Sequence, residues 1–189
     1  MSLKKQKQNN LRKFSHQELQ ARQKEKYKTP KLSLCVVLNS IRSLHNVGSI
    51  FRTCDAVGVE KLYLCGITGY PPNQQLAKTA LDAQKYVQWE YREDLLKLVD
   101  ELKAARYTIV LLEQIEGGLF YQDFKPKGKV CLIVGNEVSG IADELVEKCD
   151  TAIEIEMMGV KNSLNVSVAF GIVAYHIKQE LQKKFLVLV

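Results

Sequence analysis

Short apolar runs that alternate with segments of helical periodicity constrain the fold of this chain more than any other feature. Buried strands are predicted at residues 32–38, 61–65, 86–91, 107–112, 129–134 and 151–157. Helices are predicted between them, at residues 47–57, 74–84, 94–106 and 141–148, and a last one at 163–184. Strands that alternate with helices predict an α/β fold, with a mainly parallel sheet and flanking helices.

The length and composition favour one well-buried core. The chain has 189 residues, of which 46% are hydrophobic, and this is short for two independent domains. Its five cysteines contain no Cys-x-x-Cys pair, so we expect reduced, mostly buried thiols in a cytoplasmic protein. No apolar run approaches the roughly 18 residues of a membrane span, and the three histidines lack metal-ligand spacing. We therefore expect neither a membrane span nor a metal site.

Positive charge is concentrated at the N-terminus. Residues 1–31 carry ten Lys and Arg against two Glu, a net charge of +8, whereas residues 32–189 sum to −2. Such a basic arm suits a polyanion such as RNA, although a solvated tail explains the charge alone equally well. Ser15 as an N-cap and Glu18 as its capping-box partner, with Phe14 against Leu19, predict a short helix over residues 16–27.

The last predicted helix is apolar on more than one side in its first half. The side chains concerned are Leu164, Val166, Val168, Ala169, Phe170, Ile172, Val173, Ala174 and Tyr175. We expect one face to pack on the sheet and another on a second subunit of a homodimer; the alternative is a helix central to one larger core. This places the domain at residues 32–184, after the basic arm at 1–31 and before an apolar tail at 185–189 that has no assigned role.

Two stretches combine a predicted strand or helix end with side chains suited to ligands. Asn46 stands at a helix start, where it could cap the helix or receive an anion, and Arg52 follows six residues later. A guanidinium binds phosphate well, but it also forms ordinary surface ion pairs. Gly135 ends a buried strand and lets a ligand approach the backbone, while Glu137 either accepts hydrogen bonds at the site or caps the next helix.

A third stretch runs from the strand residue Ile155 through the loop around Gly159 to a polar helix start. Here Ser163 as a helix N-cap is the simplest interpretation. In this order, the three stretches resemble the signature motifs of the SpoU (TrmH) family of the SPOUT superfamily, which are RNA ribose 2′-O-methyltransferases. The matching segments are Asn46–Thr53, Ile133–Ile141 and Ile155–Ser167, and the resemblance covers about residues 32–180.

The resemblance implies an α/β domain with a C-terminal deep trefoil knot, which works as a homodimer. It implies S-adenosylmethionine as the cofactor, bound by Gly135, Ile155 and Leu164, with the strand end at Leu112 and Glu113 as a further contributor. The implied catalytic set is Arg52, which activates the ribose hydroxyl, with Asn46, Glu137, Ser163 and Asn165 in support. In the family, the Arg of one subunit serves the cofactor site of the other.

The function implied is methyl transfer from S-adenosylmethionine to a ribose 2′-hydroxyl of structured RNA, either tRNA or rRNA. The alternative is a non-catalytic RNA-binding protein that retains the knotted fold. None of the matched catalytic positions is replaced, which favours the enzyme. Because the chain has only the basic arm ahead of the first predicted strand, RNA recognition is expected to rest on that arm and on the dimer surface.

Overall fold

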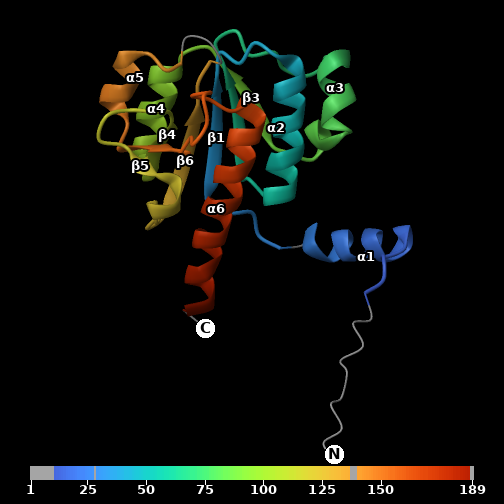
Figure 1. Ribbon diagram of the computed structural model, residues 1–189. Helices are drawn as coiled ribbons and strands as arrows, with labels where there is room; N and C mark the ends of the chain where they lie inside the picture. The colour runs from blue at the N-terminus through green and yellow to red at the C-terminus, as the bar shows by residue number, and fades with distance from the viewer. Residues whose placement is uncertain (1–10, 28, 137–139, 188–189) are drawn as a thin grey trace, which may run out of the picture. The chain divides into compact units, whose positions relative to one another are not determined.

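The computed structural model of the protein describes residues 11–27, 29–136 and 140–187 (Figure 1). The chain forms two compact units, Met1–Pro30 and Lys31–Val189. The first unit holds helix α1 (His16–Tyr27), which has the predicted bounds. The capping box is also confirmed, because the Ser15 backbone N donates to Glu18 Oε2 at 2.7 Å and the Glu18 backbone N donates to Ser15 Oγ at 3.3 Å.

The second unit is built on a sheet of seven strands in the order β3-β2-β1-β6-β4-β7-β5, in which every neighbouring pair is parallel. The strands are β1 (Leu34–Asn39), β2 (Lys61–Cys65), β3 (Trp89–Arg92), β4 (Tyr107–Leu112), β5 (Leu119–Phe120), β6 (Lys129–Val134) and β7 (Thr151–Glu154). The predicted α/β fold with a parallel sheet is confirmed. The trefoil knot stays a prediction.

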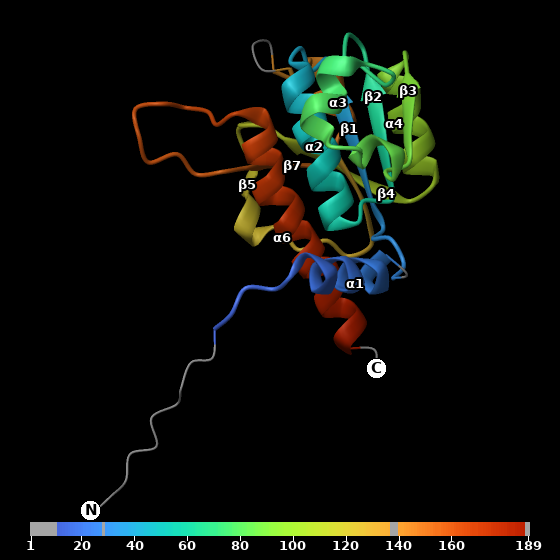
Figure 2. The same cartoon turned by 90° about the vertical axis from the view of Figure 1, so that its right-hand side faces the viewer.

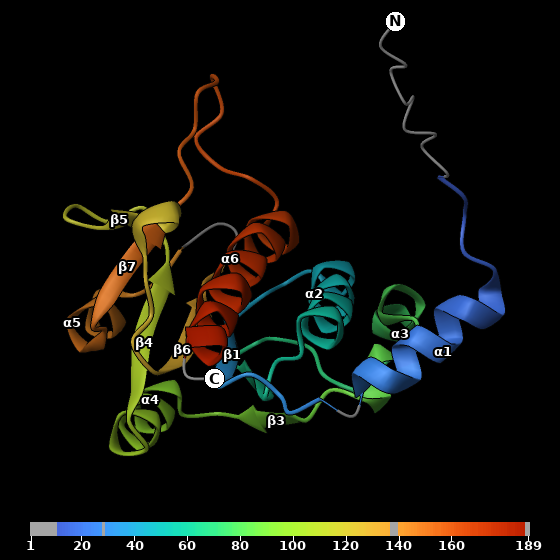
Figure 3. The same ribbon diagram turned by 90° about the horizontal axis from the view of Figure 1, so that it is seen from below.

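Helices cover both faces of this sheet, as Figure 3 shows. They are α2 (Leu44–Val57), α3 (Gln74–Ala80), α4 (Leu95–Ala104), α5 (Asp143–Lys148) and α6 (Val166–Val187), with short 3₁₀ turns η1 (Ala83–Lys85) and η2 (Tyr121–Asp123). Alternate strand residues divide the core, because side chains of successive residues point to opposite faces. Val36 and Leu132 pack with α2, α3 and α6, whereas Val37 and Ile133 pack with α4 and α5. Within the described residues, no helix is long and apolar enough to cross a membrane.

Helix α2 shows how local sequence sets the packing of a central element. Its N-cap is Ser43, whose side chain accepts from the Asn46 backbone N at 3.3 Å, so the expectation that Asn46 might cap this helix is wrong. The helix ends at Gly58, as predicted, with φ of 84°. A Cβ added at Gly48 would lie 2.0 Å from Thr79 Oγ1 and 2.6 Å from the Leu76 carbonyl oxygen. Gly48 therefore allows α2 and α3 to pack closely.

Several predicted bounds differ from the structure. The helix expected at residues 74–84 breaks after Ala80, because Leu81 and Asp82 adopt left-handed backbone angles with φ of 47° and 69°. The following strand starts at Trp89 instead of residue 86, since the intervening residues complete the 3₁₀ turn. The short strand β5 had no signal in the sequence, because two residues are too few to show a period.

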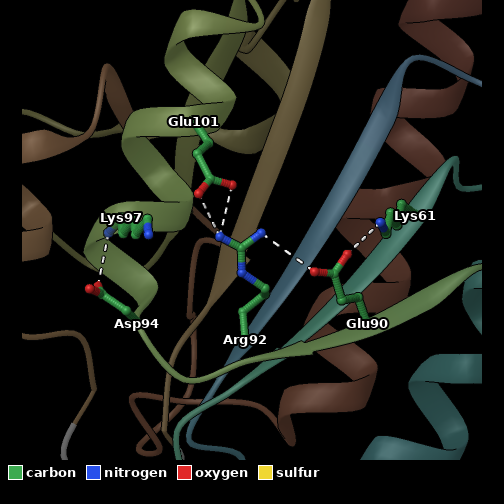
Figure 4. A network of polar contacts seen from close by, with 6 residues as sticks. All are labelled: Lys61, Glu90, Arg92, Asp94, Lys97 and Glu101. Carbon is green, nitrogen blue, oxygen red and sulfur yellow. Dashed lines mark hydrogen bonds and ion pairs between the residues drawn. The ribbon is translucent and has the colours of Figure 1, made fainter.

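Strand β3 is an edge of the sheet and is lined by ion pairs (Figure 4). Lys61 pairs with Glu90 at 2.6 Å, and Arg92 pairs with Glu90 at 3.5 Å and with Glu101 at 2.7 Å. The hydrogen bond from Lys61 lowers the pKa of Glu90, and that from Arg92 lowers the pKa of Glu101. Charged side chains on an edge strand oppose pairing with another chain.

Helix α6 has two apolar stripes, as its sequence predicts. Its buried stripe consists of Phe170, Val173, Ala174, Ile177 and Leu181. A second stripe, Val168, Ile172 and Tyr175, recurs at helical spacing but is 50%, 37% and 51% exposed. The helix begins three residues later than expected and continues past residue 184 to Val187.

Candidate functional site

A pocket opens at the carboxyl ends of β4, β6 and β7, beside the start of α6. Its volume is about 160 Å³. All four residues expected to bind the cofactor line it, namely Leu112, Gly135, Ile155 and Leu164. We call it the strand-end pocket. Ligands of open parallel sheets bind at this end of the strands, and here three strand ends meet because β4 lies between β6 and β7.

Gly135 follows β6 directly and lies close to Gly140 and Ile141. An added Cβ would lie 2.5 Å from Ile141 Cγ1 and 2.9 Å from the Gly140 carbonyl oxygen. Gly140 itself has φ of 66°, and its backbone N donates to the Asn136 carbonyl oxygen at 3.1 Å. The glycine at position 135 is therefore required by the chain itself, in addition to any ligand that approaches its backbone.

The third sequence stretch forms a long loop, residues 155–165, that projects from the sheet (Figure 2). Strand β7 ends at Glu154, so Ile155 lies just past the strand instead of within it. At the base of the loop, Gln114 Nε2 donates to the Asn162 carbonyl oxygen at 2.7 Å, which ties the end of β4 to the loop. Ser163 and Leu164 then close one side of the strand-end pocket.

Helix α6 is capped by Asn165, and the interpretation of Ser163 as the N-cap is wrong. Asn165 Oδ1 accepts from the backbone N of Ser167 at 2.9 Å and from its hydroxyl at 2.7 Å. The Asn165 carbonyl oxygen accepts the first hydrogen bonds of the helix, from Val168 and Ala169. Ser163 therefore does not cap α6 and instead lines the strand-end pocket.

Two asparagine side chains link segments far apart in the chain beside this pocket. Asn165 Nδ2 donates to Asn46 Oδ1 at 3.1 Å, which joins the first turn of α2 to the start of α6. Asn136 Nδ2 donates to the Ser40 carbonyl oxygen at 2.7 Å, which joins the turn after β6 to the loop after β1. The three sequence stretches are thus assembled around one site.

Arg52 is exposed on α2 and does not line the strand-end pocket of its own chain. Among the residues that the structure describes, it forms neither a hydrogen bond nor an ion pair. The alternative interpretation of Arg52 as one half of a surface ion pair is therefore not supported within this part of the chain. Its guanidinium faces solvent, where it is accessible to a phosphate.

Comparison with known proteins identifies the family. The model of the SpoU rRNA methylase family matches residues 33–175. The chain belongs to this family. A tRNA (guanosine(18)-2′-O)-methyltransferase of Aquifex aeolicus is 32% identical over 151 residues, covering 80% of this chain and 71% of that protein. A Staphylococcus haemolyticus protein assigned to the TrmH family of tRNA/rRNA methyltransferases is 33% identical, covering 77% of this chain and 58% of its own length.

Solved structures of SpoU family members share the fold. The A. aeolicus TrmH/SpoU tRNA modifying enzyme superposes with a TM-score of 0.77 at 30% identity, covering 89% of this chain and 85% of that one. An AdoMet-bound rRNA methyltransferase of Sinorhizobium meliloti gives a TM-score of 0.74 at 25% identity, covering 80% and 58%. The chain thus spans less than two thirds of several relatives, although it spans most of the A. aeolicus enzyme.

Glu137, the remaining residue that the family resemblance implicates, lies outside the described residues. The strand-end pocket also contains Gln114 and Glu154, which the sequence did not indicate. Glu154 lines the pocket together with Glu113, and Gln114 anchors the loop. Gln114 follows β4 and Glu154 ends β7, so the rule that ligands gather at strand ends would have found both.

The cysteines of this SpoU family member are reduced, and none is placed to act as a nucleophile. Cys35, Cys54, Cys65 and Cys131 are buried, and Cys149 is partly exposed. Burial raises the pKa of Cys35 to about 11 and that of Cys65 to about 12, so both are thiols at neutral pH. The expectation that most of the cysteines are buried is confirmed.

Proposed function

We propose that this chain transfers a methyl group from S-adenosylmethionine to a ribose 2′-hydroxyl of structured RNA, tRNA or rRNA, and that it works as a homodimer. The observation that carries the proposal is the strand-end pocket. It gathers Leu112, Gly135 and Ile155 from three strand ends and Leu164 from the loop before α6, in a chain of the SpoU family. The expected cytoplasmic location stays a prediction.

The pocket has chemistry that suits this cofactor. Leu112, Ile155 and Leu164 give apolar walls for an adenine ring, while Glu113 and Glu154 place two carboxylates beside them. Carboxylates favour the positive charges of a sulfonium and an ammonium group. A volume of about 160 Å³ is below the ~300–1,000 Å³ of most ligand sites. The pocket would therefore hold only part of the cofactor, with its apolar walls suited to the adenine ring.

Bound S-adenosylmethionine supplies an electrophilic methyl group, and the protein must position and deprotonate a weakly nucleophilic hydroxyl. A guanidinium is always protonated and is a poor base. We assign Arg52 the role of holding an RNA phosphate next to the 2′-hydroxyl, so that the phosphate accepts the proton as the oxygen–methyl bond forms and the methyl–sulfur bond breaks. Alignment then supplies much of the acceleration. Asn46, Ser163 and Asn165, with Glu137, would orient the ribose.

A homodimer would complete the site. Arg52 is absent from the lining of its own strand-end pocket, which suits an arginine that serves the partner's pocket. The exposed stripe of Val168, Ile172 and Tyr175 on α6 offers an apolar surface for a second copy. The basic arm at residues 1–31 would contribute phosphate contacts to the same RNA.

The test is transfer of labelled methyl groups from S-adenosylmethionine to total tRNA and to rRNA. We expect transfer by the wild type and a loss of about 100-fold or more in Arg52→Ala, because positioned proton transfer contributes on this scale. Arg106→Ala is the matched control: Arg106 is also exposed, but it precedes β4, at the opposite end of the strand from the pocket. Its activity should stay at the wild-type level.

A subunit-mixing experiment tests the arrangement of the dimer. Arg52→Ala and Gly135→Ala are each expected to lose most of their methyl transfer activity when assayed alone. Mixed dimers should recover part of the activity, because one pocket then combines an intact Gly135 with an intact Arg52 from the other subunit. No recovery in dimers shown to be mixed would contradict the shared site. No methyl transfer by the wild type to any RNA would favour the non-catalytic RNA-binding alternative.

A further inference from the structure

A second pocket lies at the opposite end of the sheet, against the start of the edge strand β3. We call it the edge pocket. It has a volume of about 690 Å³, within the ~300–1,000 Å³ range of ligand sites. The loop after β2, helix α3 and the 3₁₀ turn η1 form its walls with Trp89. Two strands, β2 and β1, separate β3 from the strand-end pocket.

One aromatic ring of the edge pocket belongs to a larger cluster of aromatic side chains. Trp89 lines the pocket, and the Tyr70 ring stacks on Trp89 with centroids 6.4 Å apart and an interplanar angle of 29°. Tyr91 extends the cluster, with its ring 4.8 Å from that of Tyr70. Tyr70 is 47% exposed, although aromatic side chains of this size are usually mostly covered. Exposed aromatic stacks bind unpaired RNA bases, because each base has a flat apolar face.

Three carboxamides, Asn73, Gln74 and Gln84, stand around these rings. Asn73 Oδ1 caps α3 by accepting from the backbone N of Gln75 and Leu76, which leaves its amide nitrogen as a donor. Gln84 Oε1 is buried and accepts no hydrogen bond from any described residue. A buried acceptor without a partner is costly, and rotation of its amide would present it to a donor in the pocket. Carboxamides are suited to nucleobases because they both donate and accept.

The charge of the edge pocket favours a nucleotide over a cation. Lys85 lines the pocket, and among its described lining residues there is no carboxylate. The nearby Asp82 pairs with Lys85 at 2.8 Å, and both side chains are more than 60% exposed. Such an exposed ion pair contributes little to the stability of the fold, so an RNA phosphate can replace Asp82 as the partner of Lys85. Lys78, four residues after Gln74, lies on the same face of α3 and adds a second cation.

We infer that the edge pocket binds an unpaired base of the RNA substrate, which stacks on Trp89 and Tyr70 and hydrogen-bonds to Gln84. The inference rests on the RNA methylation proposed above. Trp89, like Leu112 and Ile155 of the strand-end pocket, packs against the core on the face covered by α2, α3 and α6. Helix α2, which carries Arg52, contacts both α3 and α6. An RNA that crosses the exposed side of α2 would reach both pockets.

The experiment uses Trp89 as its own probe, because it is the only tryptophan in the chain. The full-length protein is titrated with single-stranded RNA octamers and with a base-paired RNA duplex, while tryptophan emission and octamer anisotropy are recorded. Octamers should quench the emission, since a nucleobase stacked on the indole quenches it, and the duplex should not. Gln84→Ala and Tyr70→Ala should each weaken octamer binding about fivefold or more, as expected for a lost hydrogen bond or stacking contact.

Gln88→Ala is the matched control. Gln88 is an exposed glutamine that immediately precedes Trp89 but does not line the pocket, so this variant should bind octamers like the wild type. Calorimetric affinity for S-adenosylmethionine should stay unchanged in Gln84→Ala, which shows that the variant is folded. Lys85→Ala gives a second, milder probe: it should reduce the salt dependence of octamer binding by about one phosphate contact.

Three results would overturn the inference: octamer binding by anisotropy with unchanged Trp89 emission, equal affinities of Gln84→Ala and Gln88→Ala, or adenosine monophosphate binding as tightly as the octamers. The last would assign the pocket to a free nucleotide. The outcome is separable from the proposed function. Methyl transfer without quenching would rule out only base binding in the edge pocket. Quenching without methyl transfer would rule out only the proposed methyltransferase activity.

Discussion

The two ends of the sheet form pockets by different means. At the β4–β6–β7 end, the strand-end pocket combines aliphatic walls and the carboxylates of Glu113 and Glu154 with a glycine that has no room for a Cβ. At the β3 end, the edge pocket is lined by Trp89, three carboxamides and a lysine, beside a row of surface ion pairs. A pocket shaped by the backbone tolerates few substitutions, whereas one shaped by side chains loses its contacts one at a time. The two ends should therefore differ in their response to mutation.

The largest effect on cofactor binding is expected for Gly135→Ala. The new Cβ would meet Ile141 Cγ1 and the Gly140 carbonyl oxygen, so the turn after β6 must shift and the pocket wall with it. We expect S-adenosylmethionine to bind about tenfold more weakly or worse in calorimetry, a loss of ~1.4 kcal/mol or more. Gly128→Ala, at a glycine before β6 with open space around its Cβ, is the control and should bind normally. Unchanged affinity of Gly135→Ala for S-adenosylmethionine would contradict the proposed difference between the two pockets.

Gly48→Ala should reduce stability while leaving the cofactor affinity nearly intact. The added methyl group would press on the Leu76 carbonyl oxygen and Thr79 where α2 meets α3, and overpacking of this kind costs about 1–3 kcal/mol. Gly171→Ala is the matched control within α6, where nothing lies near the new Cβ. Since alanine favours helix over glycine, that variant should gain up to about 1 kcal/mol. Urea unfolding measures both, and a destabilised Gly171→Ala would show that the clash is not the cause.

Asn165→Ala should lose the N-cap of α6, at a cost of about 1 kcal/mol in the free energy of unfolding. Asn165→Asp separates the two roles of this residue. It keeps an acceptor for the Ser167 backbone N but cannot donate to Asn46 Oδ1. If the link between α2 and α6 matters for methyl transfer, Asn165→Asp will be close to wild type in stability but reduced in kcat. Equal kcat values for Asn165→Asp and the wild type would mean that the hydrogen bond between Asn165 and Asn46 is only structural.

The smallest effect is expected at the ion pairs of β3. Lys61 lowers the pKa of Glu90, so this pair stabilises the fold at pH values above the ordinary Glu pKa, and the contribution is lost as pH falls through the lowered folded-state pKa. Glu90→Gln should cost less than about 1 kcal/mol at neutral pH, because the side chains are 34% and 39% exposed. The difference from wild type in urea unfolding should vanish at low pH. A difference that grows on acidification would contradict this assignment.

Local patterns in the sequence predicted much of the fold. The residues whose structure differs from the prediction do so because their backbone geometry is not visible in the composition. The bounds of α1, β2, β4 and β6 were predicted because each has a clear period or a strong cap. The break after Ala80 and the late start of β3 were not predicted, because the amino-acid composition gives no sign of the left-handed backbone angles at Leu81 and Asp82. For a similar reason, the N-caps of α2 and α6 are Ser43 and Asn165 and not the residues expected from the sequence. Several polar residues stand near each helix start, and only the backbone geometry selects one of them as the cap.

By itself, the sequence determined the α/β class, the parallel sheet and the two apolar faces of α6, because these depend on periodicity. The residues that meet in the strand-end pocket followed from the resemblance of three stretches to the SpoU motifs. Only the tertiary structure decided why Gly135 must be a glycine, that Asn165 joins Asn46, and that Trp89, which stacks with Tyr70, lines a second pocket together with Gln84. These are contacts between segments distant in the chain, and a local pattern does not specify which distant atoms will be neighbours.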